Sequence, residues 1–313
     1  MKGIMRIKFV LMIACFVFVL FFAAPMRAQD LGPQFKKIKD GIYVQTANDI
    51  NSNCGIVLTT DGVVLIDSGH NPTDSRAVLN AVKKLTPLPV RFLINTENHP
   101  DHITGDFVFS PPAVVIAGEG ASSAIRKNYD PDWNKNLMEQ SQEMRDAFSG
   151  YRMVYPQVEY HEKMTLYVGE RTFVIMSNRN VHSDADTAIW LPQERVLFSG
   201  AAAVPNRFNN LRSFVTIPDI LNATKIMKGL NPKIVIPGHG SPGTTKIFDD
   251  SDQYYELLLD RVAKMVRDGK SLDQILKELR MPEYDNWLAK NRFSTNIEAA
   301  YRAVKAGYSP GAK

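Results

Sequence analysis

A short stretch near the middle of the chain combines four side chains that can bind metal ions: it reads Glu97-Asn98-His99-Pro100-Asp101-His102. The apolar segment 90–96 directly precedes it and is predicted to be a buried strand that runs out into a loop. As the chain leaves the strand, residues 97, 99 and 101 point to one side and His102 extends past them. Carboxylates and imidazoles at this spacing can serve two adjacent cations. Taken alone, the stretch also fits an ordinary helix-capping turn.

The first 28 residues have the layout of a secretory signal peptide. Lys2, Arg6 and Lys8 form a basic start, an apolar run follows over 9–24, and Ala28 is a small residue suitable for cleavage. The apolar run is shorter than the 18 or so residues that a membrane-spanning helix needs. We therefore expect a cleaved leader, a periplasmic or secreted protein, and no membrane association of the mature chain.

Removal of the leader changes the charge and cysteine counts. The chain has 37 basic and 33 acidic residues, and four of the basic ones lie in the leader, so the mature chain has 33 of each. A balanced chain offers no bulk attraction for nucleic acid, and we expect a small-molecule substrate. Cys15 is lost with the leader, so no internal disulfide can form. Cys54 begins an apolar strand and is predicted to be a buried free thiol.

The remainder is long enough for one large domain with a substantial core. A helix is predicted over 75–85 between strands, and this succession favours a sheet covered by helices. An Asp61-Gly62 dipeptide between β-rich runs predicts a hairpin. Strands are predicted at 41–44, 55–60, 63–66, 90–96, 164–168, 172–176, 187–191, 195–198 and 233–236.

Two further segments are predicted to be helical. Residues 119–150 are rich in polar side chains and methionine and contain a break at Asp130-Pro131. They form either a lid over the site or a solvated helix pair without a role. From residue 249 to the end the chain is predicted to be helical, with a break at Met281-Pro282 and a final helix near 296–306.

Four of the six histidines lie in predicted loops at strand ends. Besides His99 and His102, these are His182, in a polar loop before an apolar strand, and His239, between two glycines that allow a tight bend. A single histidine at a strand end is often only a capping residue, but four across the sheet region favour a metal site. His70 directly follows the Asp67-Ser68-Gly69 turn and could approach the site, but we expect it to be a surface turn residue. We expect His161 to face solvent.

Together these landmarks resemble the metallo-β-lactamase superfamily, over roughly residues 41–240. The matching segments are Asp67-Ser68-Gly69, the 97–102 motif, His182 with Asp186, Leu197-Phe198-Ser199-Gly200, and Pro237-Gly238-His239-Gly240. The resemblance implies an α/β fold, an αββα sandwich with a dinuclear metal site at one sheet edge. The expected parts are a signal peptide (1–28), a metallo-β-lactamase-fold domain (29–248) with a helical insertion near 119–150, and a C-terminal helical extension of that domain (249–313).

The resemblance also implies a ligand set for two zinc ions. The first ion takes Glu97, His99 and His182, and the second takes Asp101, His102 and His239. Asp67 matches the buried aspartate that orients ligating histidines. In this arrangement a hydroxide held between the metals attacks a polarised carbonyl. Asp101 is the candidate catalytic residue, which orients that nucleophile or receives a proton.

Two positions depart from the family pattern. Glu97 stands where most of the superfamily has histidine, which makes the first metal a weaker Lewis acid or shifts its preference toward Mn or Fe. Ala201 stands where many relatives carry an aspartate that bridges the metals, as glyoxalase II-like and persulfide-dioxygenase-like proteins do. The metallo-β-lactamase subclass without a cysteine ligand also lacks that bridge and resembles this chain most closely.

We therefore expect an exported zinc hydrolase that cleaves an amide, lactam, lactone or ester bond, with β-lactamase-like chemistry. Glu97 and Ala201 motivate one alternative, a non-catalytic periplasmic metal-binding accessory protein with a decayed site. The carboxylate-rich first position motivates another, an iron-dependent redox enzyme. The segment with Asn206, Arg207, Asn209 and Asn210 either contacts substrate or is an ordinary polar loop.

Overall fold

The computed structural model describes residues 30–46, 51–178 and 181–308, and the expected signal peptide lies outside these ranges. From residue 31 onward, the described residues form one compact unit. Among the described residues, no helix is both long enough and apolar enough to cross a membrane.

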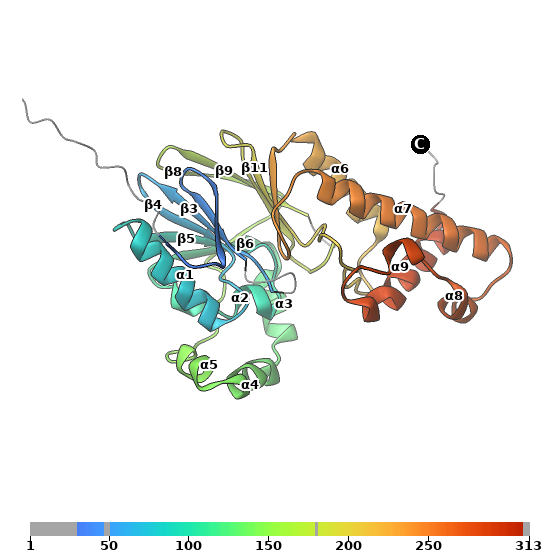
Figure 1. The fold of residues 1–313 in the computed structure, drawn as a ribbon, viewed down its shortest axis with the longest axis horizontal. Coiled ribbons are helices and arrows are strands. Elements are labelled where there is room, and N and C mark those ends of the chain that lie inside the picture. Colours follow the sequence, from blue (N-terminus) through green and yellow to red (C-terminus); the bar gives the residue numbers. More distant parts are fainter. Residues whose placement is uncertain (1–29, 47–50, 179–180, 309–313) are drawn as a thin grey trace, which may run out of the picture. The chain divides into compact units, whose positions relative to one another are not determined.

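Two β-sheets form the centre of the described structure (Figure 1). The first sheet has the strand order β1-β2-β3-β4-β5-β6-β7 and the second β12-β11-β10-β9-β8. The first sheet contains β1 (Phe35–Lys39), β2 (Ile42–Gln45), β3 (Cys54–Thr59), β4 (Gly62–Ile66), β5 (Val90–Ile94), β6 (Val114–Gly118) and β7 (Val158–Tyr160). The second contains β8 (Lys163–Val168), β9 (Arg171–Ser177), β10 (Thr187–Leu191), β11 (Val196–Gly200) and β12 (Ile234–Pro237).

Helices lie along the outer faces of both sheets (Figure 1). The helices of the first half are α1 (Pro72–Leu85), α2 (Pro100–Ile103), η1 (Asp106–Val108), α3 (Ala121–Asn128), α4 (Pro131–Gln140) and α5 (Gln142–Ala147). Those of the second half are α6 (Ile217–Gly229), α7 (Lys246–Arg267), α8 (Leu272–Glu278), η2 (Pro282–Tyr284), η3 (Lys290–Arg292) and α9 (Phe293–Lys305).

The alternation of side chains along the strands produces this layering. In β4, Val63 and Leu65 pack toward α1, whereas Val64 and Ile66 pack between the two sheets. Successive side chains of a strand point to opposite faces, so a strand that is apolar at every position requires cover on both sides. Helices α6 and α7 share one hydrophobic cluster with the second sheet, and α9 joins it by packing on α7 and α6. The prediction of an αββα sandwich is confirmed.

The sequence patterns located each predicted strand but missed several elements. Each of the nine predicted strands overlaps a strand of the structure. The prediction omitted β1, which carries three lysines in five residues, and β7, which has only three residues. It also omitted β6 and helix α6, whose N-cap Thr216 accepts a hydrogen bond from the backbone of Asp219. Edge strands and short strands lack the continuous apolar pattern on which such predictions depend, which accounts for β1 and β7. Strand β6 is apolar and internal, so that reason does not apply to it.

The prediction that Cys54 is a buried free thiol is confirmed. Its side chain is fully buried, and its thiol donates to the backbone oxygen of Asp67 over 3.0 Å. Burial, and the nearby carboxylate of Asp67, raise the pKa of the Cys54 thiol well above its ordinary value. The thiol therefore serves as a packing group under the site.

An aromatic cluster fastens the C-terminal helices to the loop after β11. The ring of Phe208 lies 5.5 Å from Tyr254, 5.5 Å from Trp287 and 5.4 Å from Phe293, centroid to centroid. Close by, the side-chain amide of Asn296 donates to the backbone oxygen of residue 209 over 2.8 Å. The segment 206–212 is thus held by the C-terminal helices, which lie far from it in the sequence, and not by the sheets alone.

Replacement of Phe208 by alanine tests this attachment. The ring is 5% exposed, so Phe208→Ala removes buried contacts and should lower the free energy of unfolding by about 3–5 kcal/mol. Phe214→Ala is the matched control, because Phe214 is 38% exposed and its loss should cost less than about 1 kcal/mol. Urea denaturation followed by circular dichroism measures both. Equal losses in the two variants would contradict the attachment.

Candidate metal centre

Parallel strand pairs bring the chemically active loops to one edge of the sheets. Strands β4 and β5 run parallel with Ile66 opposite Ile94, so Asp67 and the loop after β5 leave the first sheet side by side. Strands β11 and β12 are also parallel, and His239 follows β12. A β-bridge between Ser52 and His239 joins the two sheets here. Such strand ends are where α/β proteins build their sites.

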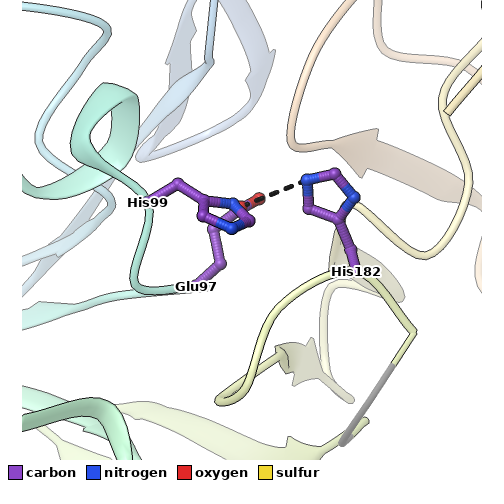
Figure 2. Close-up of side chains that lie close together, drawn as sticks. All are labelled: Glu97, His99 and His182. Carbon is purple, nitrogen blue, oxygen red and sulfur yellow. Dashed lines mark hydrogen bonds and ion pairs between the residues drawn. The ribbon is translucent and has the colours of Figure 1, made fainter. Parts of the chain in front are cut away.

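Glu97 lies between the two histidines of the first expected metal position. Its Oε2 atom contacts Nδ1 of His99 and lies 3.5 Å from Nε2 of His182. Figure 2 shows the carboxylate and the two imidazoles facing one another from two separate loops. The two rings meet edge to face with centroids 4.9 Å apart. Only 2% of Glu97 is exposed, so its charge is shielded from bulk water.

The second expected position is formed by Asp101, His102 and His239. The Nε2 atoms of His102 and His239 lie 3.3 Å apart. Oδ2 of Asp101 lies 3.5 Å from Nε2 of His239 and 3.8 Å from Nε2 of His102. Oε1 of Glu97 lies 3.1 Å from Nε2 of His102, so Glu97 reaches this group too. The six residues that the sequence proposes as ligands therefore lie in one connected cluster.

The spacing of these atoms suits metal ions better than hydrogen bonds. A tetrahedral zinc ion with bonds of about 2.0–2.2 Å holds its ligand atoms roughly 3.3–3.5 Å apart. Oε1 of Glu97 is buried and accepts no hydrogen bond, which is costly for a carboxylate oxygen unless a cation is nearby. Three pairs have the tetrahedral spacing: His102–His239 at 3.3 Å, Asp101–His239 at 3.5 Å and Glu97–His182 at 3.5 Å.

Asp67 fixes the orientation of His102. Its Oδ2 atom accepts hydrogen bonds from Nδ1 of His102 over 2.9 Å and from the hydroxyl of Thr96 over 2.6 Å. Its Oδ1 atom accepts from the backbone N–H of Thr96 over 2.7 Å. Because Asp67 holds Nδ1 of His102, Nε2 faces the cluster, where a metal ion can take the place of its proton. Asp67 has a φ of +59°, a left-handed conformation that aspartate tolerates better than most residues.

The charges of the cluster favour a bound cation. Burial opposes a charge on His102, but the carboxylates of Glu97, Asp67 and Asp101 outweigh it and raise the pKa of His102 to about 10. Burial, reinforced by His102, lowers the pKa of His239 to about 4. Burial also opposes a charge on Glu97, yet the surrounding imidazoles hold the pKa of Glu97 well below its ordinary value. Without a metal, the carboxylates therefore hold a proton on His102, and a metal ion that binds there takes the place of that positive charge.

Asp186 shapes the loop that carries His182. Its carboxylate accepts backbone N–H groups from Val181 over 3.0 Å, His182 over 2.7 Å and Ser183 over 2.8 Å. Burial, together with the charge of Glu97, raises the pKa of Asp186 to about 7. The sequence marked Asp186 only as a landmark, and the structure shows that it organises this turn.

The structure corrects the expectation for one of the remaining histidines. His70, expected as a surface turn residue, lies beside the cluster, with Nδ1 4.0 Å from Oδ2 of Asp101 and 20% of its side chain exposed. The expectation was wrong because the turn after β4 folds back over the loop that carries the motif. His161 is 67% exposed and pairs with Glu119 over 2.7 Å, as expected for a residue that faces solvent.

The 119–150 segment lines a small cavity beside the cluster. This cavity holds about 40 Å³ and is bounded on one side by His99, Pro100 and Ile103 of the motif loop. From the 119–150 segment it is bounded by side chains that include Tyr129 and Trp133. The segment is therefore in contact with the candidate site, and its role as a lid remains a prediction.

Arginines near the cluster were largely missed by the sequence analysis, which named only Arg207. Asp101 interacts electrostatically with both Arg207 and Arg292, and these two guanidinium groups interact with each other. Nη1 of Arg212 donates to the backbone oxygen of His182 over 2.9 Å. Arg292 lies in the C-terminal part of the chain, where arginine on a helical surface carries no distinctive signal. By contrast Asn209 is buried and donates to the backbone oxygen of Ala201 over 2.8 Å, so its role is structural.

An αββα sandwich with a carboxylate–imidazole cluster at its sheet edge defines a class of metal-binding proteins. The sequence profile of the metallo-beta-lactamase superfamily matches residues 47–239. That range covers more than half of the chain and contains all six candidate ligands. The protein belongs to the metallo-beta-lactamase superfamily, as its motifs predicted. Members of this superfamily are mostly metal-dependent hydrolases.

Known relatives include sulfatases and β-lactamases. The "Alkyl/aryl-sulfatase BDS1" of Saccharomyces cerevisiae is 23% identical over 317 aligned positions, which cover 87% of this chain and 49% of the relative. The sec-alkylsulfatase Pisa1 from Pseudomonas sp. has a similar structure, with a TM-score of 0.68 and 20% identity over 89% of this chain and 51% of its own. A metallo-beta-lactamase from Pontibacter korlensis gives a TM-score of 0.57 and 19% identity over 70% and 96%. The chain spans about half the length of these sulfatases, and such identities establish the fold alone.

Asp67 provides a test of how the cluster is held. Asp67→Asn keeps the left-handed backbone but places an amide N–H or a weaker acceptor against Nδ1 of His102, so zinc affinity should fall about 10–100-fold. Zinc titration against a competing chelator measures this change. Asp61→Asn, on the exposed hairpin where Asp61 pairs with Arg91, is the matched control and should leave zinc affinity unchanged. Unaltered affinity in Asp67→Asn would contradict the orienting role.

Proposed function

We propose that the protein is a hydrolase that uses two zinc ions bound in the Glu97 cluster. The observation that carries this proposal is the set of buried nitrogen and oxygen atoms at metal-ligand spacing on a superfamily fold. The first ion is assigned to Glu97, His99 and His182, and the second to Asp101, His102 and His239. The N/O ligand set matches the preference of zinc in catalytic sites.

The protein side chains have distinct tasks in this proposal. Zinc ions bound there supply an ionised water near neutral pH and positive charge beside the negative charge that develops in the reaction. Asp101 is the most accessible carboxylate of the cluster, with 22% of its side chain exposed against 1% for Glu97. We assign to Asp101 the orientation of the attacking water and the acceptance of its proton. His70 lies beside Asp101, with Nδ1 4.0 Å from Oδ2, and its Nδ1 atom accepts the backbone N–H of Ser52 over 3.4 Å.

The charges around the cluster favour a substrate with an anionic group. Burial, and the neighbouring Arg292, lower the pKa of Arg207, yet its guanidinium remains a cation beside Asp101. Arg212 is held against the His182 loop by its own hydrogen bond. Guanidinium groups beside a reacting centre bind sulfate, carboxylate or phosphate through paired hydrogen bonds. The same arrangement gives no advantage to a neutral ester or lactone.

Among anionic substrates, alkyl or aryl sulfate esters are the class that we propose first, with β-lactams second. The likeness to the sulfatases extends over 87–89% of the chain, whereas the likeness to the β-lactamase covers 70%. Both substrate classes carry an anionic group that suits the arginines. In the sulfate reaction, water adds and one C–O or S–O bond breaks, which gives an alcohol and inorganic sulfate.

A substrate panel tests the proposal. The purified protein, loaded with zinc, is assayed on dodecyl sulfate, 4-nitrophenyl sulfate, nitrocefin, a neutral ester and a neutral lactone. We expect turnover of an anionic substrate, its loss after chelation and its return with zinc. Asp101→Asn should lower kcat about 100-fold or more, whereas Asp132→Asn, in the exposed first turn of α4, should not change it. Two bound zinc ions without any turnover would favour the accessory-protein alternative, and iron in place of zinc would favour the redox alternative.

Arg207 provides a separate test of the substrate's charge. Arg207→Gln should raise KM for the anionic substrate about 10–100-fold, the effect of losing hydrogen bonds to a charged group, with a smaller change in kcat. Arg195→Gln is the matched control, because Arg195 is half-buried in the turn before β11 and donates to the backbone oxygen of residue 231. An equal rise in KM for a neutral substrate would contradict recognition of the anion.

A further inference from the structure

We propose that the carboxylate of Glu97 bridges the two metal ions, with Oε2 on the first and Oε1 on the second. This inference rests on the proposed dinuclear centre and refines it, since the sequence assigns Glu97 to the first position only. The family's usual bridging aspartate is absent here, because Ala201 has only a methyl group. In this chain the bridge comes from the start of the motif instead.

The two oxygens of Glu97 face different groups of ligands. Oε2 contacts His99 and lies 3.5 Å from Nε2 of His182. Oε1 lies 3.1 Å from Nε2 of His102 and accepts no hydrogen bond. Glu97 is thereby shared by both ligand triads of the described residues, Glu97–His99–His182 and Glu97–His102–His239, each with all its ligand atoms within 4.8 Å of one another. The two oxygens of this one carboxylate therefore lie at the two expected metal positions.

The other carboxylates near the cluster have partners on one side of it only, or outside it. Oδ2 of Asp101 lies near His102, His239 and His70, all on the side of the second ion. Asp67 is occupied by Thr96 and by Nδ1 of His102, behind the ring. Asp186 accepts the backbone N–H groups of the His182 turn. Among the described residues, Glu97 is the carboxylate whose two oxygens point to both ligand groups.

The backbone holds Glu97 in this position. The preceding residue, Thr96, donates its N–H to Asp67 over 2.7 Å, and its backbone oxygen accepts from the N–H of Thr187 in the other sheet over 2.7 Å. Thr96 is thus tied to both sheets. A rigid carboxylate between two cations 3.5–4 Å apart is the usual geometry of a two-metal site. It also places one negative charge between two like charges, which reduces their repulsion.

A histidine at this position would act differently, and this difference supplies the test. An imidazole at position 97 gives one nitrogen to one ion, so Glu97→His should keep the first position intact and remove a ligand from the second. To isolate the second position, Glu97→His is combined with His182→Ala, which removes a ligand of the first. We expect zinc affinity of the second position to fall about 10–100-fold relative to His182→Ala alone. Glu170→Gln on the same background, at an exposed turn, is the control.

The experiment uses zinc titration of the full chain against a chromogenic chelator, with circular dichroism to confirm folding. Unchanged affinity in the double variant would overturn the bridge and return Glu97 to the first position alone. A crystal structure of the zinc-loaded wild-type protein gives a second measurement that needs no variant. We expect each Glu97 oxygen within about 2.2 Å of a different ion, and both oxygens on one ion would overturn the proposal. Zinc affinity and geometry are independent of turnover, so a protein that hydrolyses no substrate but shows the bridge would refute the proposed function alone.

Discussion

The carboxylate of Asp67 is the interaction on which the site depends most. It stands at the end of β4 and binds Thr96 at the end of β5 and the ring of His102 in the following turn. One side chain thus joins two strands to the motif loop. Because Thr96 also pairs with Thr187 of the second sheet, this network aligns the loops of both sheets. This network sets the positions of Glu97 and His102. It therefore also sets the position of a metal ion bound between them.

The surroundings of the site come from parts of the chain that the metal motifs do not include. Aromatic packing around Phe208 and Tyr254 holds the segment after β11 against the C-terminal helices. This segment carries Arg207, and Arg292 precedes α9. The C-terminal helices therefore contribute charge and shape to the substrate side, whereas the sheets supply the ligands. In the proposed function, the metal chemistry and the choice of substrate thus reside in different parts of the fold.

The sequence predicted the sheets from local patterns, and it predicted the cluster from one local motif together with the resemblance to the family. Apolar runs marked the buried strands, and the spacing from Glu97 to His102 constrained four side chains at once. The sequence left open whether His70 approaches the site, and it could not reveal that Arg292 interacts with Arg207, because these residues stand in ordinary local patterns. It also missed β1 and β7, which sit at the outer edges of their sheet, where exposure removes the apolar pattern.

Glu97 changes the charge of this centre, and the proposed bridging position explains how the centre can use that charge. A carboxylate in place of histidine adds a negative charge to a buried site, and on one ion alone that charge would weaken the Lewis acid. Shared between two ions, the same charge screens their repulsion and offsets the loss of the aspartate that Ala201 replaces. The substitutions at positions 97 and 201 then form a compensating pair. With the bridge supplied by the motif loop, Ala201 is 2% exposed and its backbone oxygen accepts a hydrogen bond from Asn209, so the end of β11 holds the segment that carries Arg207.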